Sequence, residues 1–123
     1  MVRFLGYFNA CLVVILSMRA PYMAWFKRTE KAEWKKTLTK AIRRLHPIFG
    51  GVLAVTGITH GYMAWGWNFR HTGYLLYGFV LLQAILGIGL LRKKRSLKNM
   101  HRLVSVGTLF LLGLHIFYRT ALG

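Results

Sequence analysis

Four long apolar stretches alternate with short polar segments along the chain, and this pattern predicts four membrane-spanning helices. Each stretch is close to the ~20 residues that a helix needs to cross the hydrocarbon core of a bilayer. Helices are expected because every backbone polar group in lipid must find its partner within the chain. The predicted spans cover about residues 4–26, 45–65, 73–91 and 102–118.

Two details modify this pattern. Arg19 and Pro21 interrupt the first span and leave a clean apolar run only from Phe4 to Met18. After it, residues 30–44 read EKAEWKKTLTKAIRR, with large apolar side chains recurring every four residues on one helical face. A basic amphipathic helix of this kind lies at the interface of lipid and water. We therefore predict a single all-α domain over residues 1–123, an integral membrane four-helix bundle with a cytoplasmic surface helix.

The distribution of charge predicts the orientation of the spans. The 123 residues carry a formal net charge of +16 although 55% of them are hydrophobic. Of the 18 Lys and Arg, eight lie in residues 27–44 and six in residues 92–102. Positive loops mark the cytoplasmic side of membrane proteins, so both termini should lie outside a bacterial-type inner membrane. Nucleic-acid binding is disfavoured because the basic clusters flank spans and no nucleic-acid motif accompanies them.

Four histidines recur at one interval in two of the predicted spans. His46 and His60 lie fourteen residues apart in the second span, and His101 and His115 repeat that interval in the fourth. Fourteen residues return a helix to within ~40° of the same face, about 21 Å further along its axis. Both spans should run from inside to outside, which gives an inner pair, His46 and His101, and an outer pair, His60 and His115. An imidazole is costly inside a membrane without a partner, so each pair indicates a shared ligand.

The types of residue in these spans narrow the choice of ligand. Zinc normally adds Cys, Asp or Glu, and the two histidine-bearing spans supply none. Copper is often held by His and Met, but Met63 and Met100 are not arranged with both pairs. Haem iron needs only two axial ligands, which one His from each helix provides. No Cys-x-x-Cys-His signature is present, so the pattern favours two non-covalent b-type haems with the four histidines as iron ligands.

Small and cationic residues near the histidines are further predicted contacts of the haems. Glycines give room for a flat macrocycle, although close helix packing explains them equally well. Arginines bind carboxylates such as the haem propionates, although topology or lipid contact is an equal alternative. The predicted set contains Gly50, Gly61 and Gly87, which lies fourteen residues after Gly73, together with Arg44 and Arg102 at the inner site and Arg119 at the outer site.

Two His-x13-His helices separated by one helix resemble the membrane di-haem b-type cytochromes. That group includes the four-helix core of respiratory and photosynthetic cytochrome b, and the ferric-reductase and NADPH-oxidase transmembrane domains use a similar device. The resemblance covers about residues 45–118 and matches the four histidines residue by residue. It implies a non-catalytic cytochrome b subunit that carries electrons across the bilayer. This chain has only four predicted spans and no flavin or quinone-oxidising domain, so the resemblance does not identify the electron donor or acceptor.

Several partners and alternatives follow from the same residues. A soluble redox subunit with an acidic face is expected to dock on the basic loops, and membrane lipid surrounds the spans. A quinone is a further expected ligand, with His71 at the outer connection as the residue that assists its protonation. The alternatives are a haem-free membrane anchor, a small metal-transport module, and a self-sufficient quinone-dependent oxidoreductase.

Overall fold

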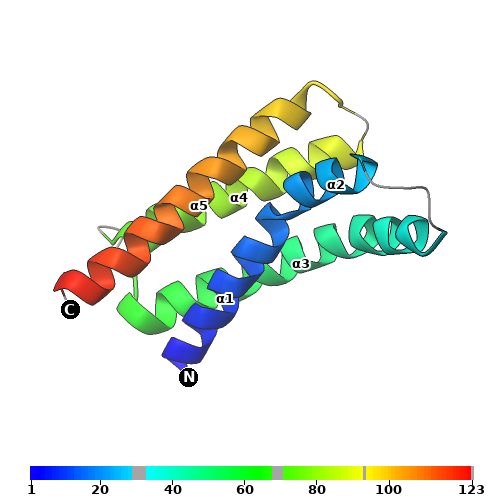
Figure 1. The fold of residues 1–123 in the computed structure, drawn as a ribbon. Helices are drawn as coiled ribbons and strands as arrows, with labels where there is room; N and C mark the ends of the chain where they lie inside the picture. Colours follow the sequence, from blue (N-terminus) through cyan, green and yellow to red (C-terminus); the bar gives the residue numbers. More distant parts are fainter. Residues whose placement is uncertain (29–32, 68–70, 93, 123) are drawn as a thin grey trace.

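The computed structural model describes residues 1–28, 33–67, 71–92 and 94–122, and the side chains of residues 27, 28 and 119–122 lie outside this description. Within these ranges the chain is helical and contains no strand (Figure 1). This confirms the all-α prediction. The helices are α1 (Val2–Ser17), α2 (Arg19–Arg28), α3 (Glu33–Trp65), α4 (Thr72–Leu91) and α5 (Leu97–Leu122).

The interruption expected in the first span coincides with the boundary between α1 and α2. Met18 keeps a near-helical conformation there, with φ −69° and ψ −12°. Its N–H donates to the Val14 carbonyl at 3.0 Å, and its own carbonyl accepts the Tyr22 N–H at 3.0 Å. Pro21 lies in the first turn of α2, where a missing N–H is tolerated. Residues 2–26 therefore form one nearly continuous helical pass.

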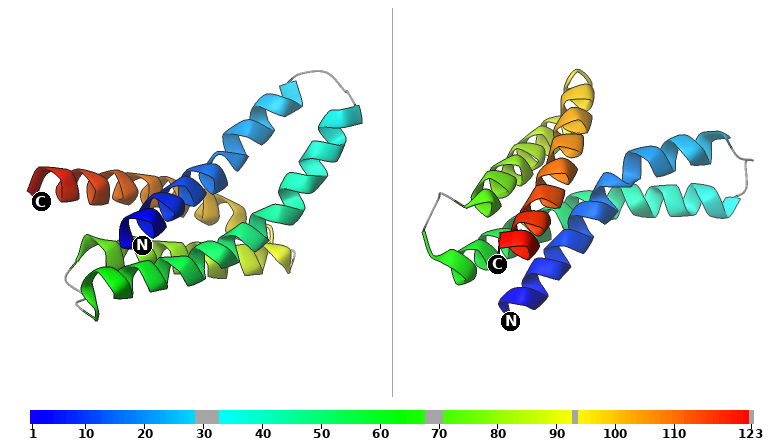
Figure 2. Two further views of the ribbon diagram at one scale, coloured as in Figure 1. Left: turned by 90° about the horizontal axis from the view of Figure 1, so that it is seen from below. Right: turned by 60° about the vertical axis from the view of Figure 1, so that its left-hand side comes forward.

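Helix α3 differs from the predicted division into a surface helix and a separate span. Residues 33–44 are helical as expected, but they continue without a break into residues 45–65, while residues 30–32 lie outside the description. Pro47 lies inside α3 and removes one backbone hydrogen bond, which bends a helix without having to end it. Figure 2 shows α3 changing direction between its cyan and green parts. The charged segment is thus an extension of the histidine-bearing helix.

The end of α3 is set by Gly66. This residue has a φ of +58°, a left-handed conformation that glycine adopts without steric penalty. Its N–H donates to the Tyr62 carbonyl at 2.8 Å, and its own carbonyl accepts a hydrogen bond from the Tyr74 hydroxyl of α4. Gly66 therefore ends α3 and links it to α4.

The helices form a bundle in which α1 and α4 each pack on both α3 and α5. Helices α3 and α5 consequently lie diagonally across the bundle, and they run in the same direction (Figure 1). This arrangement agrees with the parallel orientation predicted for the two histidine-bearing spans. The centre of the bundle is filled by a small apolar cluster of Leu12, Val13, Leu53, Val80 and Leu112.

Polar side chains link the helices across this narrow core. The Thr56 hydroxyl donates to Asn9 Oδ1 at 2.6 Å, and Asn9 Nδ2 donates to the Thr56 carbonyl at 3.2 Å, which ties α1 to α3. Gln83 Nε2 donates to the hydroxyl of Thr108 at 3.0 Å between α4 and α5. Thr108 is only 2% exposed. Such interhelical hydrogen bonds are typical of helix association in membranes, where lipid is as apolar as leucine.

Three helical stretches among the described residues are long and apolar enough to cross a membrane, namely Val2–Phe26, Thr72–Leu91 and Leu97–Tyr118. Large apolar side chains in their middle parts are exposed, including Ile85 at 65% and Phe110 at 67%. Exposed apolar surface of this extent is expected where lipid covers the protein. The predicted span at 45–65 does not reach the same apolarity because threonines, glycines and His60 dilute it. The fold therefore supports a membrane protein with three evident spans.

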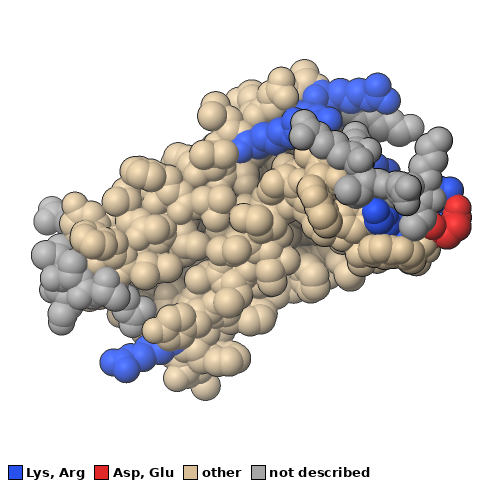
Figure 3. Space-filling model, in the orientation of Figure 1, with Lys and Arg blue, Asp and Glu red and all other residues tan. Residues whose placement is uncertain are grey.

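The basic segments gather at one end of the bundle. Figure 3 shows most of the visible Lys and Arg side chains at the end of the bundle with the start of α3 and the connection of α4 to α5. The two chain termini lie at the opposite end (Figure 1). Both basic segments therefore face the same side, as the orientation argument requires.

Cysteine labelling will test which side that is. In a Cys11→Ser background, Lys36→Cys and Lys94→Cys are expected to react with an impermeant thiol reagent only after the membrane is opened. Trp67→Cys, at the other end of the bundle, should react in intact cells. All three native side chains are exposed, so each position is reachable by the reagent. The opposite pattern of labelling would reverse the orientation.

Candidate functional site

The inner histidine pair comes together at the basic end of the bundle. His46 on α3 and His101 on α5 approach across the diagonal, with ring centroids 6.2 Å apart and ring planes at 72°. Both side chains are half-buried. Arg19, at the start of α2, lies near enough for its charge to act on both rings. Residues from three helices thus converge on one small region.

The separation of the inner pair fits a shared iron. When one ion lies between two imidazoles, each metal–nitrogen bond is about 2 Å long, and each nitrogen lies about 1 Å from the centre of its own ring. The two ring centres are then roughly 6 Å apart. The 6.2 Å between the rings has this size. Nδ1 of His101 is buried without a hydrogen bond of normal geometry, although the ring lies near the Gln83 carbonyl. A separation of 6.2 Å with ring planes at 72° is also normal for an edge-to-face contact, so the spacing permits a shared iron without requiring one.

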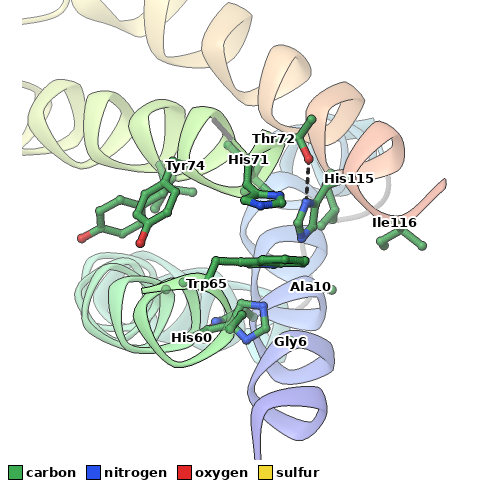
Figure 4. A pocket seen from close by; sticks show the side chains of 18 of the residues that line it. Gly6, Ala10, His60, Trp65, His71, Thr72, Tyr74, His115 and Ile116 are labelled. Carbon is green, nitrogen blue, oxygen red and sulfur yellow. Dashed lines mark hydrogen bonds between the residues drawn. The ribbon is translucent and has the colours of Figure 1, made fainter. Parts of the chain in front are cut away.

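The outer pair lines a large cavity at the end of the bundle that holds the chain termini. This cavity has a volume of about 930 Å³, and residues of α1, α3, α4 and α5 line it. That volume is at the upper end of the range for cofactor pockets. His60 enters it from α3 and His115 from α5 (Figure 4). The cavity is large enough for a porphyrin, and α3 and α5 each bring one imidazole to its wall.

Glycines of α1 and α4 lie beside three of the four imidazoles. A Cβ on Gly6 of α1 would lie 3.0 Å from His60 Cε1, and one on Gly73 would lie 3.2 Å from His115 Cε1. A Cβ on Gly87 would lie 3.7 Å from His101 Cε1. The fourteen-residue interval from Gly73 to Gly87 on α4 therefore matches the interval from His101 to His115 on the antiparallel α5. Gly73 and Gly87 therefore lie beside imidazole rings, and their predicted contact with the macrocycles stays a prediction.

At the outer cavity, one histidine ring is within hydrogen-bonding distance of a threonine and another stacks on a tryptophan. His115 Nδ1 lies 3.0 Å from the Thr72 hydroxyl at the start of α4 (Figure 4). His71, the fifth histidine, stacks on Trp65 with ring centroids 3.8 Å apart and planes at 22°. Both rings also line the cavity. His71 is therefore part of the wall of the outer site and does not contact the inner one.

The remaining predicted site residues occupy varied positions. Gly61 lines the outer cavity beside the Tyr74 ring, and a Cβ at Gly50 would meet nothing within 4 Å. Arg44 and Arg102 are exposed at the basic end, and their role with propionates stays a prediction. The side chain of Arg119 lies outside the described part of the chain.

Three residues with a place at the two sites were not predicted in that role. Gly6 lies in α1, far from either histidine interval, and no pattern in the sequence connects it with His60. Thr72 precedes the predicted third span, so its contact with His115 depends on how α4 and α5 pack. Arg19 appeared to be a residue of the membrane interface, because only the position of α2 places it near the inner pair.

No three His, Cys, Asp or Glu side chains of the described residues come together as a metal-binding group. Comparison of the chain with protein-family models, with curated proteins and with solved structures finds no match. The chemistry of the two histidine pairs is therefore the main guide to function.

Proposed function

We propose that this chain is a membrane electron-transfer subunit that binds two b-type haems, one at each histidine pair. The observation that carries this proposal is the pairing of histidines from two diagonal, parallel helices at both ends of the bundle. The inner rings have the separation that a shared ion requires. The outer rings line a cavity of about 930 Å³ that has room for a porphyrin.

Each side chain has a defined task in this proposal. One imidazole from α3 and one from α5 would bind the haem iron at each site. Gly6 and Gly73 leave space for the His60 and His115 rings, where a Cβ would be tight. Arg19, Arg44 and Arg102 provide positive charge for propionates at the inner site. A bis-histidine haem supplies one-electron transfer and leaves no open position on the iron for substrate.

The proposal includes the expected topology and partners. The second half of α3 packs between α1 and α4, two helices that have membrane-spanning length and apolarity, so we infer that it crosses the membrane with them. The basic end then faces the cytoplasm, where a soluble redox subunit with an acidic face docks. At the other end, electrons are exchanged with a quinone or a protein near His71. The two haems would provide a route between these ends.

Haem analysis of the purified chain tests this function. We expect two haems per chain by the pyridine haemochrome method, both low-spin, because each iron has two histidine ligands. A reduced-minus-oxidised spectrum of b type should accompany them. A haem-free protein would instead support a membrane anchor or a metal-transport module. One haem per chain would contradict the assignment of one histidine pair.

A further inference from the structure

The outer pair contains a contact with a side-chain hydroxyl that the described interactions of the inner pair lack. His115 Nδ1 lies 3.0 Å from the Thr72 hydroxyl. Thr72 is the first residue of α4, and the N-cap position before it is His71, which makes no side-chain capping hydrogen bond. The Thr72 hydroxyl is directed to α5, where His115 lies near the end of the helix (Figure 4). The contact thus fixes a ring of α5 from a neighbouring helix.

If His115 binds a metal, one ring nitrogen must offer its lone pair, and this determines which nitrogen carries the proton. A neutral imidazole carries one N–H and one lone pair, and a metal takes the lone pair. The Thr72 hydroxyl occupies the Nδ1 side, so Nε2 is the nitrogen left to bind iron. Nδ1 then carries the proton and donates it in a hydrogen bond to Thr72 Oγ1. Gly73, the next residue, lies beside the same ring, and a Cβ there would come within 3.2 Å of Cε1.

We propose that Thr72 is a positioning residue for the outer haem, which fixes the tautomer and orientation of His115 and lowers the reduction potential at that site. This inference rests on the proposed function. A hydrogen bond from Nδ1–H to an acceptor increases the electron density of the imidazole and makes it a stronger ligand. A stronger donor favours the oxidised iron, which carries more positive charge. The effect is confined to the outer site because Thr72 contacts only His115 of the four ligands in the described interactions.

The test compares Thr72→Val with Thr72→Ser. Valine keeps the shape of threonine but removes the acceptor, whereas serine keeps the hydroxyl. We expect the outer haem of Thr72→Val to remain bound with a higher midpoint potential and an altered low-spin electron paramagnetic resonance signal. Thr72→Ser should resemble the native protein, and the inner haem should be unchanged in both variants. Potentiometric titration followed by optical spectroscopy resolves the two haems and needs no electron-transfer partner.

The possible results separate this role from the proposed function. Loss of the outer haem in Thr72→Val with its retention in Thr72→Ser would also support a positioning hydroxyl. Equal behaviour of the two variants, whether both native-like or both altered, would overturn the role of Thr72 while leaving the two-haem function intact. A native protein that binds no haem at all would overturn the proposed function itself, and this role with it.

Discussion

Alanine at either His60 or His115 is expected to remove the same haem, and alanine at either His46 or His101 to remove the other. Each single substitution should lower the haem content from two to one per chain. The reason is that a bis-histidine haem would lose one of its two iron–histidine bonds. Haem content and the two components of the redox titration together identify which haem is lost.

Double variants make this pairing a strict test. His60→Ala with His115→Ala should lose no more haem than either single variant, because both side chains serve one iron. His60→Ala with His46→Ala should lose both haems. The matched control is His71→Ala, since His71 also lines the outer cavity but stacks on Trp65. It should retain two haems. If His46→Ala and His60→Ala removed the same component, the diagonal pairing of α3 and α5 would be wrong.

The arrangement of the helices was largely predictable from the sequence because lipid imposes simple rules. Apolar stretches of about 20 residues must be helical, and positive loops must lie on one side. From these rules alone, the second and fourth spans had to run in the same direction. The fourteen-residue interval then placed His46 beside His101 at one end of the bundle. The structure agrees, with the two rings 6.2 Å apart.

The continuity of α3 was not predictable in the same way. The change from a charged segment to an apolar one at about residue 45 normally marks the junction of a surface helix with a span, and Pro47 strengthens that expectation. Proline, however, removes only one hydrogen bond from a helix that the neighbouring turns continue to support. The predicted span at 45–65 also contains His60 and two threonines, and its mean hydropathy is lower than that of the neighbouring spans.

Contacts between helices depend on rotation about each helix axis, which a single sequence specifies poorly. The sequence shows that Gly73 and Gly87 lie fourteen residues apart, but it does not show which side chains of other helices they contact. In the structure Gly73 lies beside His115, where a Cβ would be tight, and Gly87 lies beside His101, where a Cβ would be at ordinary contact distance. Gly6 has no periodic partner at all, and only the packing of α1 on α3 brings it to His60. A glycine contact of this kind can be identified only once the packing of the helices is known.

Gly6→Ala is expected to weaken binding of the outer haem while leaving the inner haem in place. The added Cβ would lie 3.0 Å from His60 Cε1 and 3.4 Å from Nε2, closer than side chains normally approach. The imidazole must therefore move, and its movement changes the alignment of Nε2 with His115 across the cavity. Overpacking of this kind costs about 1–3 kcal/mol, which corresponds to a roughly 5- to 150-fold loss of affinity.

The matched control for this substitution is Gly113→Ala on α5, where an added Cβ meets nothing within 4 Å. Both changes replace a helical glycine with alanine, so the gain in helix propensity of up to ~1 kcal/mol is common to them. Titration of haem into the haem-depleted protein, with the inner haem as internal reference, measures the difference. Gly113→Ala should bind both haems as the native protein does. If Gly6→Ala bound the outer haem equally well, His60 would have freedom to move without loss of ligation, and α1 would have no part in shaping the outer site.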